Sequence, residues 1–400
     1  MAGGKAVHRG LILGVVVVSG AVLAAVVAFD PKDLWHRLTG RSGADSRPAA
    51  DATGFYRATE PTTNARGSVL RSELLDPGDD LPDGTRLLRI AYETLDARDQ
   101  PVVASAAVAI PPNAADAPIA VWGHGAVGTA PGCGPSRRGF AAPYAASLLA
   151  DGVIVVAPDF TGLGMEGVPY PYLHGTSAGR SVLDAARAAR NVEPAASNRV
   201  ALYGTSAGGH AVLWANQLAV GEDGSGLDVR AVVAVAPIAS LPTAMAHFSV
   251  TPGLAPYAVQ LAATWPSVVP GLDPGAVLTP AALARQDVLG SSCLAQLMDH
   301  FGGPPSQWLG RDGFLDPTWA TQLAEQSPGS SAGAAEVLLF QGERDTSVLP
   351  AWTTQLASDL EAGGTATTLV TNRNADHVGM VAASQVQAVE AMLARLRTSS

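Results

Sequence analysis

The stretch Arg199-Val-Ala-Leu-Tyr-Gly-Thr-Ser-Ala-Gly208 decides the fold. Its first half is mostly apolar and predicts a buried strand, and the residues from Gly209 onward predict a helix. Between the two lies the pentapeptide Gly-x-Ser-x-Gly, which places its serine on a tight turn from strand to helix. The flanking glycines avoid the clashes that a Cβ atom would cause there. Ser206 is therefore the candidate nucleophile.

The same pentapeptide, Gly-Thr-Ser-Ala-Gly, occurs a second time at residues 175–179. This copy follows Val168-Pro-Tyr-Pro-Tyr172, whose prolines exclude a central strand. It lacks the strand–turn–helix context that the motif needs. We predict that Ser177 is a capping or loop residue before a helix over residues 180–191.

Short apolar runs alternate with helical patterns on both sides of Ser206. Apolar runs of this length are typical of strands in a parallel sheet that helices cover on both faces. The predicted strands are residues 86–92, 102–110, 119–122, 153–157, 200–203, 229–236, 337–340 and 367–370. The predicted helices are residues 143–150, 181–190, 207–219, 350–361 and 378–396. The fold class is therefore α/β, with a doubly wound, mostly parallel sheet.

Residues 241–330 interrupt this alternation. They contain many prolines and no clear strand, and Thr279-Pro280 and Asp316-Pro317 each place a capping residue before a proline at the first helical position. Ser292 is a further candidate cap, for a helix over residues 293–301. The segment is either a cap over an apolar pocket or a helical subdomain whose aromatic residues fill its own core. We divide the remainder into a core of residues 53–240 and 331–400.

A serine nucleophile needs a base, and the base needs an orienting acid. His377 follows the last predicted strand, where a base can reach Ser206 across the carboxyl edge of the sheet. Asp345 follows the strand at 337–340 and is the favoured acid. Glu343 is the main alternative, and Asp376 is disfavoured because neighbouring side chains in a loop usually point apart.

The reaction also needs backbone N–H groups that stabilise the oxyanion of the tetrahedral intermediate. One donor is expected from Ala207, directly after the nucleophile. The other is expected from the loop after residues 119–122, at Ala126 or Val127. His124 in this loop is predicted to brace it without transferring protons.

The composition and motifs of the chain argue against several classes of ligand. The formal net charge of −10 disfavours nucleic-acid binding. No His, Cys or Asp cluster has metal-ligand spacing, and the glycine-rich segments lack the lysine and strand context of a phosphate loop. We expect neither a metal nor another cofactor.

The N-terminal segment, residues 1–29, resembles a targeting signal. Lys5 and Arg9 precede an uncharged run over residues 10–29 that is long enough, at about 1.5 Å per residue, to cross a bilayer as a helix. It is either a signal peptide cut after Val26-Val27-Ala28 or an uncleaved anchor. Residues 30–52 read as a linker, and both alternatives place the remaining chain outside the cytoplasm, secreted or anchored at the cell envelope.

Export changes the interpretation of the two cysteines, Cys133 and Cys293. In an oxidising compartment they are able to pair, and the alternative is two separate buried thiols.

Several motifs together resemble the secretory lipase family of lipase-A type within the α/β-hydrolases. They are Trp122-Gly-His-Gly-Ala-Val-Gly128, Cys133-Gly-Pro-Ser136, Val156-Ala-Pro-Asp-Phe-Thr-Gly-Leu-Gly164 and the Gly204–Gly208 turn. The resemblance covers residues 55–398 and implies an α/β-hydrolase fold with a lid, acyl-ester substrates and no cofactor. It also implies that the cysteine after the His-Gly loop pairs with one in the lid, which favours Cys133–Cys293.

The leading hypothesis is an exported serine esterase or lipase that acts on acyl-glycerol-type esters as a monomer. An acyltransferase would use the same three residues with an alcohol in place of water. A peptidase of the same fold and a catalytically inactive binding protein are further alternatives.

Overall fold

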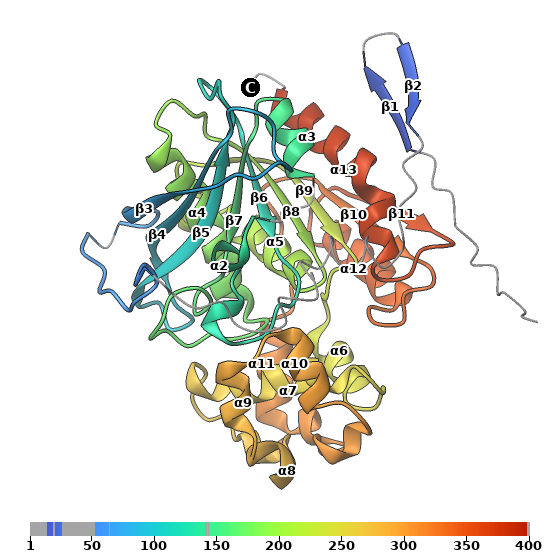
Figure 1. Cartoon of the computed structure of the whole chain (residues 1–400). Helices are drawn as coiled ribbons and strands as arrows, with labels where there is room; N and C mark the ends of the chain where they lie inside the picture. The colour runs from blue at the N-terminus through green and yellow to red at the C-terminus, as the bar shows by residue number, and fades with distance from the viewer. Residues whose placement is uncertain are drawn as a thin grey trace, which may run out of the picture.

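The computed structural model describes residues 14–18, 21–25, 53–63, 65–140, 142 and 144–397. A nine-stranded sheet forms the centre of the molecule, in the order β11-β10-β9-β8-β6-β7-β5-β4-β3 (Figure 1). The strands from β11 to β7 pair in parallel, and β7, β5, β4 and β3 pair antiparallel. The strands are β3 (Val69–Leu75), β4 (Arg86–Leu95), β5 (Pro101–Ile110), β6 (Ile119–Gly123), β7 (Ile154–Pro158), β8 (Arg199–Thr205), β9 (Asp228–Val235), β10 (Val337–Gly342) and β11 (Thr367–Asn372).

Helices cover both faces of this sheet. They are α2 (Pro135–Arg138), α3 (Ala145–Ala150), α4 (Gly175–Val192), α5 (Ala207–Leu218), α12 (Pro350–Ala362) and α13 (Gly379–Arg397). One buried apolar cluster joins the sheet to α4, α5 and α12, and a second joins its other face to α3 and α13. The predicted doubly wound, mostly parallel α/β fold is confirmed.

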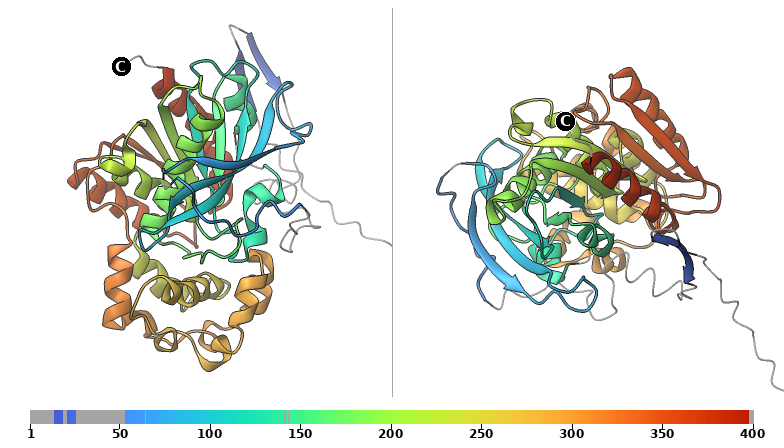
Figure 2. Two further views of the ribbon diagram at one scale, coloured as in Figure 1. Left: turned by 90° about the vertical axis from the view of Figure 1, so that its left-hand side faces the viewer. Right: turned by 90° about the horizontal axis from the view of Figure 1, so that it is seen from above.

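Six short α-helices between β9 and β10 form a separate lobe, which we call the helical lobe (residues 241–330). It lies at one end of the sheet in Figure 1 and in the left-hand view of Figure 2. Its helices are α6 (Leu241–Phe248), α7 (Ala255–Thr264), α8 (Pro280–Leu283), α9 (Gln286–Ser291), α10 (Leu294–His300) and α11 (Pro317–Glu325). Thr279 and Asp316 cap α8 and α11 through their side chains, as predicted. The cap of α10 is Cys293 and not Ser292.

The helical lobe has its own apolar core, which includes the stacked rings of Trp265 and Trp319. The same cluster extends to Ala207, next to the candidate nucleophile, and to Val348, just after the candidate acid. The aromatic residues therefore fill the core of the lobe, and that core is continuous with the edge of the sheet where the candidate site lies.

Two elements differ from the sequence expectation. The edge strand β3 was not predicted, because its sequence Val-Leu-Arg-Ser-Glu-Leu-Leu lacks a clear apolar pattern. Helix α4 begins at Gly175, earlier than expected, so Ser177 lies inside the first turn of the helix and not in a loop before it.

Much of the predicted targeting segment and its linker lies outside the described residues. Within it, β1 (Gly14–Val18) and β2 (Ala21–Ala25) pair as two antiparallel strands. The described residues contain no helix that combines the length and the apolar character needed to cross a membrane.

Candidate active site

Ser206 lies between the end of β8 and the start of α5 with φ 54° and ψ −117°. A positive φ is strained for a residue with a Cβ, at a cost of roughly 1–3 kcal/mol. The surrounding structure holds this turn, because the Ser206 N–H donates to Val235 O at 2.9 Å and its carbonyl accepts from His210 and Ile238. The side chain is only partly buried. This is the strained strand-to-helix turn that the motif requires.

Both motif glycines are needed for close packing beneath this turn. A Cβ on Gly204 would lie 2.2 Å from Gly208 O, and a Cβ on Gly208 would lie 1.9 Å from Gly123 O. Real Cβ atoms do not approach so closely, so any larger residue would displace α5 from β8 and β6. The glycines therefore allow the helix to begin directly above the sheet.

The candidate base and acid lie in the loops after β11 and β10, which are parallel neighbours. His377 Nδ1 contacts Asp345 Oδ2 at 2.7 Å. The two loops are joined by backbone hydrogen bonds, including Arg344 N–H to Ala375 O at 3.0 Å. The Asp345 side chain is fully buried, whereas that of His377 retains 26% exposure. The imidazole is thus fixed on one side and open on the other.

Asp345 is held by several donors. Its Oδ1 accepts from the N–H groups of Ser347 and Val348 at 2.8 and 2.9 Å. Its Oδ2 also accepts from Gln341 Nε2 at 3.3 Å, and Gln341 is itself held by the Thr353 hydroxyl at 2.6 Å. Sequence reasoning missed Gln341, although a glutamine that ends an apolar strand is a signal for a buried polar contact.

The alternative acid, Glu343, is exposed and accepts a hydrogen bond from the Thr371 hydroxyl at 3.1 Å. Asp376 is also exposed, and its Oδ1 accepts from Gly379 N–H at 2.7 Å. The structure therefore pairs His377 with Asp345 and places both alternatives in solvent-facing turns.

The candidate oxyanion loop follows β6, which pairs directly with β8 through Gly123 and Gly204. Ala207 opens α5, and first-turn N–H groups have no acceptor within their own helix. A Cβ on Gly125 would be 3.7 Å from Thr205 O, so the loop contacts the turn that carries Ser206. Ala126 and Val127 follow Gly125 and are partly buried. All three candidate donors therefore belong to segments that adjoin the nucleophile.

His124 is buried at the start of this loop and its Nδ1 contacts Gly125 O at 2.7 Å. Its ring packs on Phe160 with centroids 4.3 Å apart. Burial lowers the pKa of His124 to about 4, so the ring is neutral at neutral pH. These contacts fit a bracing role.

Asp159, which directly follows β7, was not predicted as a site residue. It is fully buried and accepts from Ser105 Oγ at 2.6 Å, from Ser136 N–H at 2.8 Å and from the Ser136 hydroxyl. Burial raises the pKa of Asp159 to about 6, and these hydrogen bonds offset part of that rise. Asp159 thereby fixes the segment after Cys133 against the end of β7.

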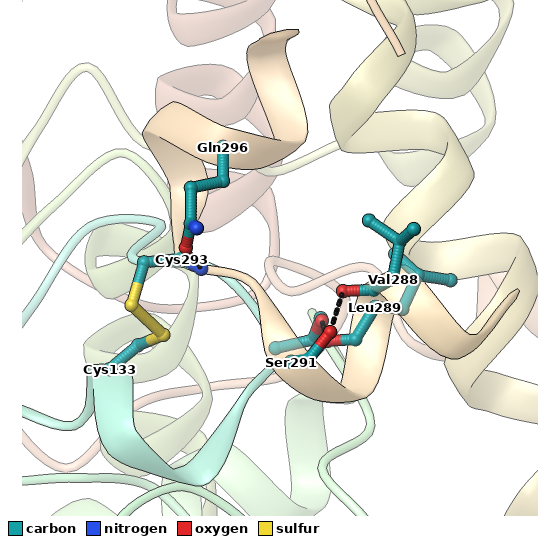
Figure 3. Close-up of a disulfide and its surroundings, with 7 residues drawn as sticks. Cys133, Val288, Leu289, Ser291, Cys293 and Gln296 are labelled. Atoms are coloured by element: carbon teal, nitrogen blue, oxygen red, sulfur yellow. Dashed lines mark hydrogen bonds between the residues drawn. A yellow bond between two sulfur atoms is a disulfide. The ribbon is translucent and has the colours of Figure 1, made fainter. Parts of the chain in front are cut away.

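Cys133 and Cys293 form a disulfide between this segment and the helical lobe (Figure 3). Both residues are buried, and their Cα atoms are 5.5 Å apart. Pairing was predicted as one of two alternatives and is confirmed.

The first copy of the pentapeptide has a packing role. Its Gly175 faces the indole of Trp214, where a Cβ would lie 2.0 Å from Nε1, and a Cβ on Gly179 would lie 2.9 Å from Ala215 N. These glycines let α4 pack closely against α5. Ser177 is buried, which is consistent with a structural position.

His174 directly precedes α4, and its titration tests whether this region is buried. Burial, with a smaller contribution from Arg180, lowers the pKa of His174 to about 4. Below about pH 6.5 the unfolded chain protonates this residue while the folded chain does not, so stability is lost as pH falls. Between pH 7 and pH 5 the free energy of unfolding should fall by about 2 kcal/mol through His174 alone.

The variant His174→Phe should therefore lose about 2 kcal/mol less stability than the wild type between these two pH values, as measured by urea unfolding. His124 and Asp159 titrate in both proteins and cancel in the comparison. The pKa of His210 is lowered mainly by burial, and His174 contributes only a smaller part through its charge. An equal loss in both proteins would show that His174 is not desolvated.

Within the described part of the chain, no group of three or more His, Cys, Asp or Glu side chains is arranged to hold a metal ion.

A small pocket adjoins Ala207. Most of the residues that line it are apolar, and the polar side chains of Ser177 and His210 also line it.

The sheet order and the strained serine turn are those of the α/β-hydrolase fold. Residues 141–268 match the family model "Secretory lipase", and residues 316–399 match the model "TAP-like protein". The predicted resemblance to secretory lipases is confirmed. No curated protein sequence matches this chain.

Solved structures with the same fold include three hydrolases. Lipase A of Candida antarctica in its closed state has a TM-score of 0.72 at 18% identity, over 89% of each chain. The rice cell wall degrading esterase LipA of Xanthomonas oryzae has a TM-score of 0.69 at 18% identity, over 82% of this chain and 97% of its own. A putative hydrolase of Legionella pneumophila has a TM-score of 0.72 at 18% identity, over 83% of this chain and 99% of its own. Together with the family match, these neighbours support a carboxylic ester hydrolase.

Proposed function

We propose that the chain is an exported serine esterase or lipase that hydrolyses carboxylic esters through Ser206, His377 and Asp345. The observation that carries the proposal is the His377–Asp345 pair at the sheet edge that also bears the strained Ser206. The secretory lipase match and the disulfide indicate an extracytoplasmic enzyme. Export through residues 1–29 stays a prediction.

The contact between His377 and Asp345 dictates the protonation of the imidazole. Because the Asp345 carboxylate can only accept, the neutral His377 ring carries its proton on Nδ1 and donates it to Oδ2. Nε2 is then the basic nitrogen. In the proposed reaction Nε2 removes the Ser206 hydroxyl proton as Oγ attacks the ester carbonyl. The N–H groups of Ala207 and of Ala126 or Val127 stabilise the resulting oxyanion. The protonated imidazole then gives its proton to the leaving alcohol.

The acyl-enzyme is released by a second, similar step. Water loses a proton to His377 Nε2 and attacks the acyl carbonyl, and collapse of the intermediate returns the proton to Ser206. In this scheme residues 241–330 serve as a cap over the acyl chain. The continuity of the lobe's apolar core with Ala207 supports that role.

The direct test is hydrolysis of p-nitrophenyl esters with acyl chains of increasing length. We expect turnover together with covalent labelling of the protein by a fluorophosphonate. An unlabelled protein that hydrolyses none of these esters would overturn the proposal. Addition of an alcohol acceptor separates hydrolysis from acyl transfer, because transfer would yield a new ester in place of the free acid.

A further inference from the structure

The helical lobe makes a row of contacts with the candidate oxyanion loop. Leu294 N–H donates to Val127 O at 2.8 Å, and Gly128 pairs with Cys293 in an antiparallel bridge. Next to these, Thr129 Oγ1 donates to Leu289 O and Ala130 N–H donates to Ser292 O at 3.4 Å. The disulfide at Cys133 ends the row. One short segment of the lobe therefore lies alongside the loop as an extra strand would.

The contact is too close to be incidental. Gly128 has φ 108°, and a Cβ at this position would lie 2.6 Å from the Cα of Cys293. Only a glycine lets the two backbones approach in this way. Figure 3 shows Cys293 bonded to Cys133 just before α10, with Gln296, whose Oε1 accepts from the Cys293 N–H at 3.1 Å, close to it.

The loop is thus held from two sides. At its beginning the core holds it, because the His124 ring packs on Phe160 and its Nε2 contacts Asp159 O at 3.4 Å. From Val127 onward the contacts come from the lobe. Because an oxyanion donor stabilises the transition state only when its N–H is aimed in advance, the support of Val127 bears directly on catalysis.

We propose that the lobe segment Ser292–Leu294 is a positioning element for ester hydrolysis. By fixing the Val127 carbonyl and the Gly128 backbone, it orients the peptide groups of the oxyanion loop before substrate arrives. This inference rests on the proposed esterase function. It assigns to the lobe a part in stabilising the transition state, in addition to any contact with the acyl chain.

The sharpest test breaks the contact between the lobe and the loop at one backbone hydrogen bond. Leu294 is the first residue of α10, a position that tolerates proline because its N–H makes no bond within the helix. The preceding Cys293 has φ −85° and ψ 169°, the extended conformation that a residue before proline prefers. Leu294→Pro therefore deletes the donor to Val127 O and places its ring Cδ against that oxygen, so it separates the lobe segment from the loop while α10 itself tolerates the proline. Leu294→Ala is the matched control, since it shortens the side chain and keeps the N–H.

We expect kcat for a p-nitrophenyl ester to be about 10-fold lower in Leu294→Pro than in Leu294→Ala, with KM within about twofold. The inhibition constant of an alkylboronic acid, whose serine adduct is tetrahedral, should rise by a similar factor. A loss of packing alone would change KM as well, and would not be confined to kcat and the boronate inhibition constant. Equal kcat and equal boronate affinity in the two variants would overturn the proposal.

A second variant guards against poor folding of the proline variant. Thr129→Val keeps the shape of the side chain and removes the hydroxyl that donates to Leu289 O. It should lower kcat about threefold with little change in KM. An unchanged kcat in Thr129→Val, if Leu294→Pro does not fold, would equally count against the inference. If the wild type hydrolyses no ester at all, the proposed function itself fails.

Discussion

Replacing Ser206 by alanine should lower kcat for ester hydrolysis by about 10⁴- to 10⁶-fold. The variant lacks the hydroxyl that forms the acyl-enzyme, and the remaining oxyanion donors and substrate binding leave only a small residual rate. Steady-state hydrolysis of a short p-nitrophenyl ester measures the effect, and fluorophosphonate labelling should disappear with it. Turnover near the wild-type rate would exclude Ser206 as the nucleophile.

The chain supplies its own control for this experiment. Ser177 occupies the same place in an identical pentapeptide but is buried in the first turn of α4. Ser177→Ala removes the same hydroxyl from the same local sequence, so it should retain kcat within about threefold of the wild type. A large loss in Ser177→Ala with none in Ser206→Ala would reverse the assignment of the two copies.

Replacing Asp345 by asparagine should lower kcat by about 10³- to 10⁴-fold. The amide is nearly the same size, so the fold should persist. It removes the negative charge that stabilises the imidazolium and presents an N–H₂ group that favours the wrong tautomer of His377. Steady-state kinetics at neutral pH measures the loss.

The matched variant is Glu343→Gln, which makes the same chemical change two residues away. Because Glu343 is exposed and its carboxylate accepts its hydrogen bond from Thr371 and not from His377, kcat should stay within about twofold of the wild type. Comparable losses in both variants would mean that general electrostatics, and not the contact with His377, explain the effect.

Much of the core could be predicted because its strands are short apolar runs with helices between them. The two pentapeptides were separable for the same reason, since only the second follows an uninterrupted strand. Asp345 was identifiable from its place after a buried strand, but the groups that hydrogen-bond to its carboxylate were not. The hydrogen bond from Gln341 depends on how the chain turns after β10, which no local pattern encodes.

The edges of the molecule were harder to predict. β3 is half exposed and carries Arg71, Ser72 and Glu73, so it shows little apolar signal. The early start of α4 escaped notice because two glycines and a threonine are poor helix formers, and packing against Trp214 and Ala215 outweighs their weak propensity. The contacts of residues 127–130 with the lobe join segments about 160 positions apart and could not be read from either one.

The disulfide also restricts how the helical lobe can move relative to the sheet. The chain crosses into the helical lobe near residue 240 and leaves it near residue 330, and the bridge at Cys293 is a third covalent attachment. A body joined at two points can swing about the line between them, and a third covalent attachment restricts that motion. If the lobe caps the acyl chain as proposed, we expect substrate to enter as individual lobe helices shift past one another, and not by the whole lobe opening as a flap.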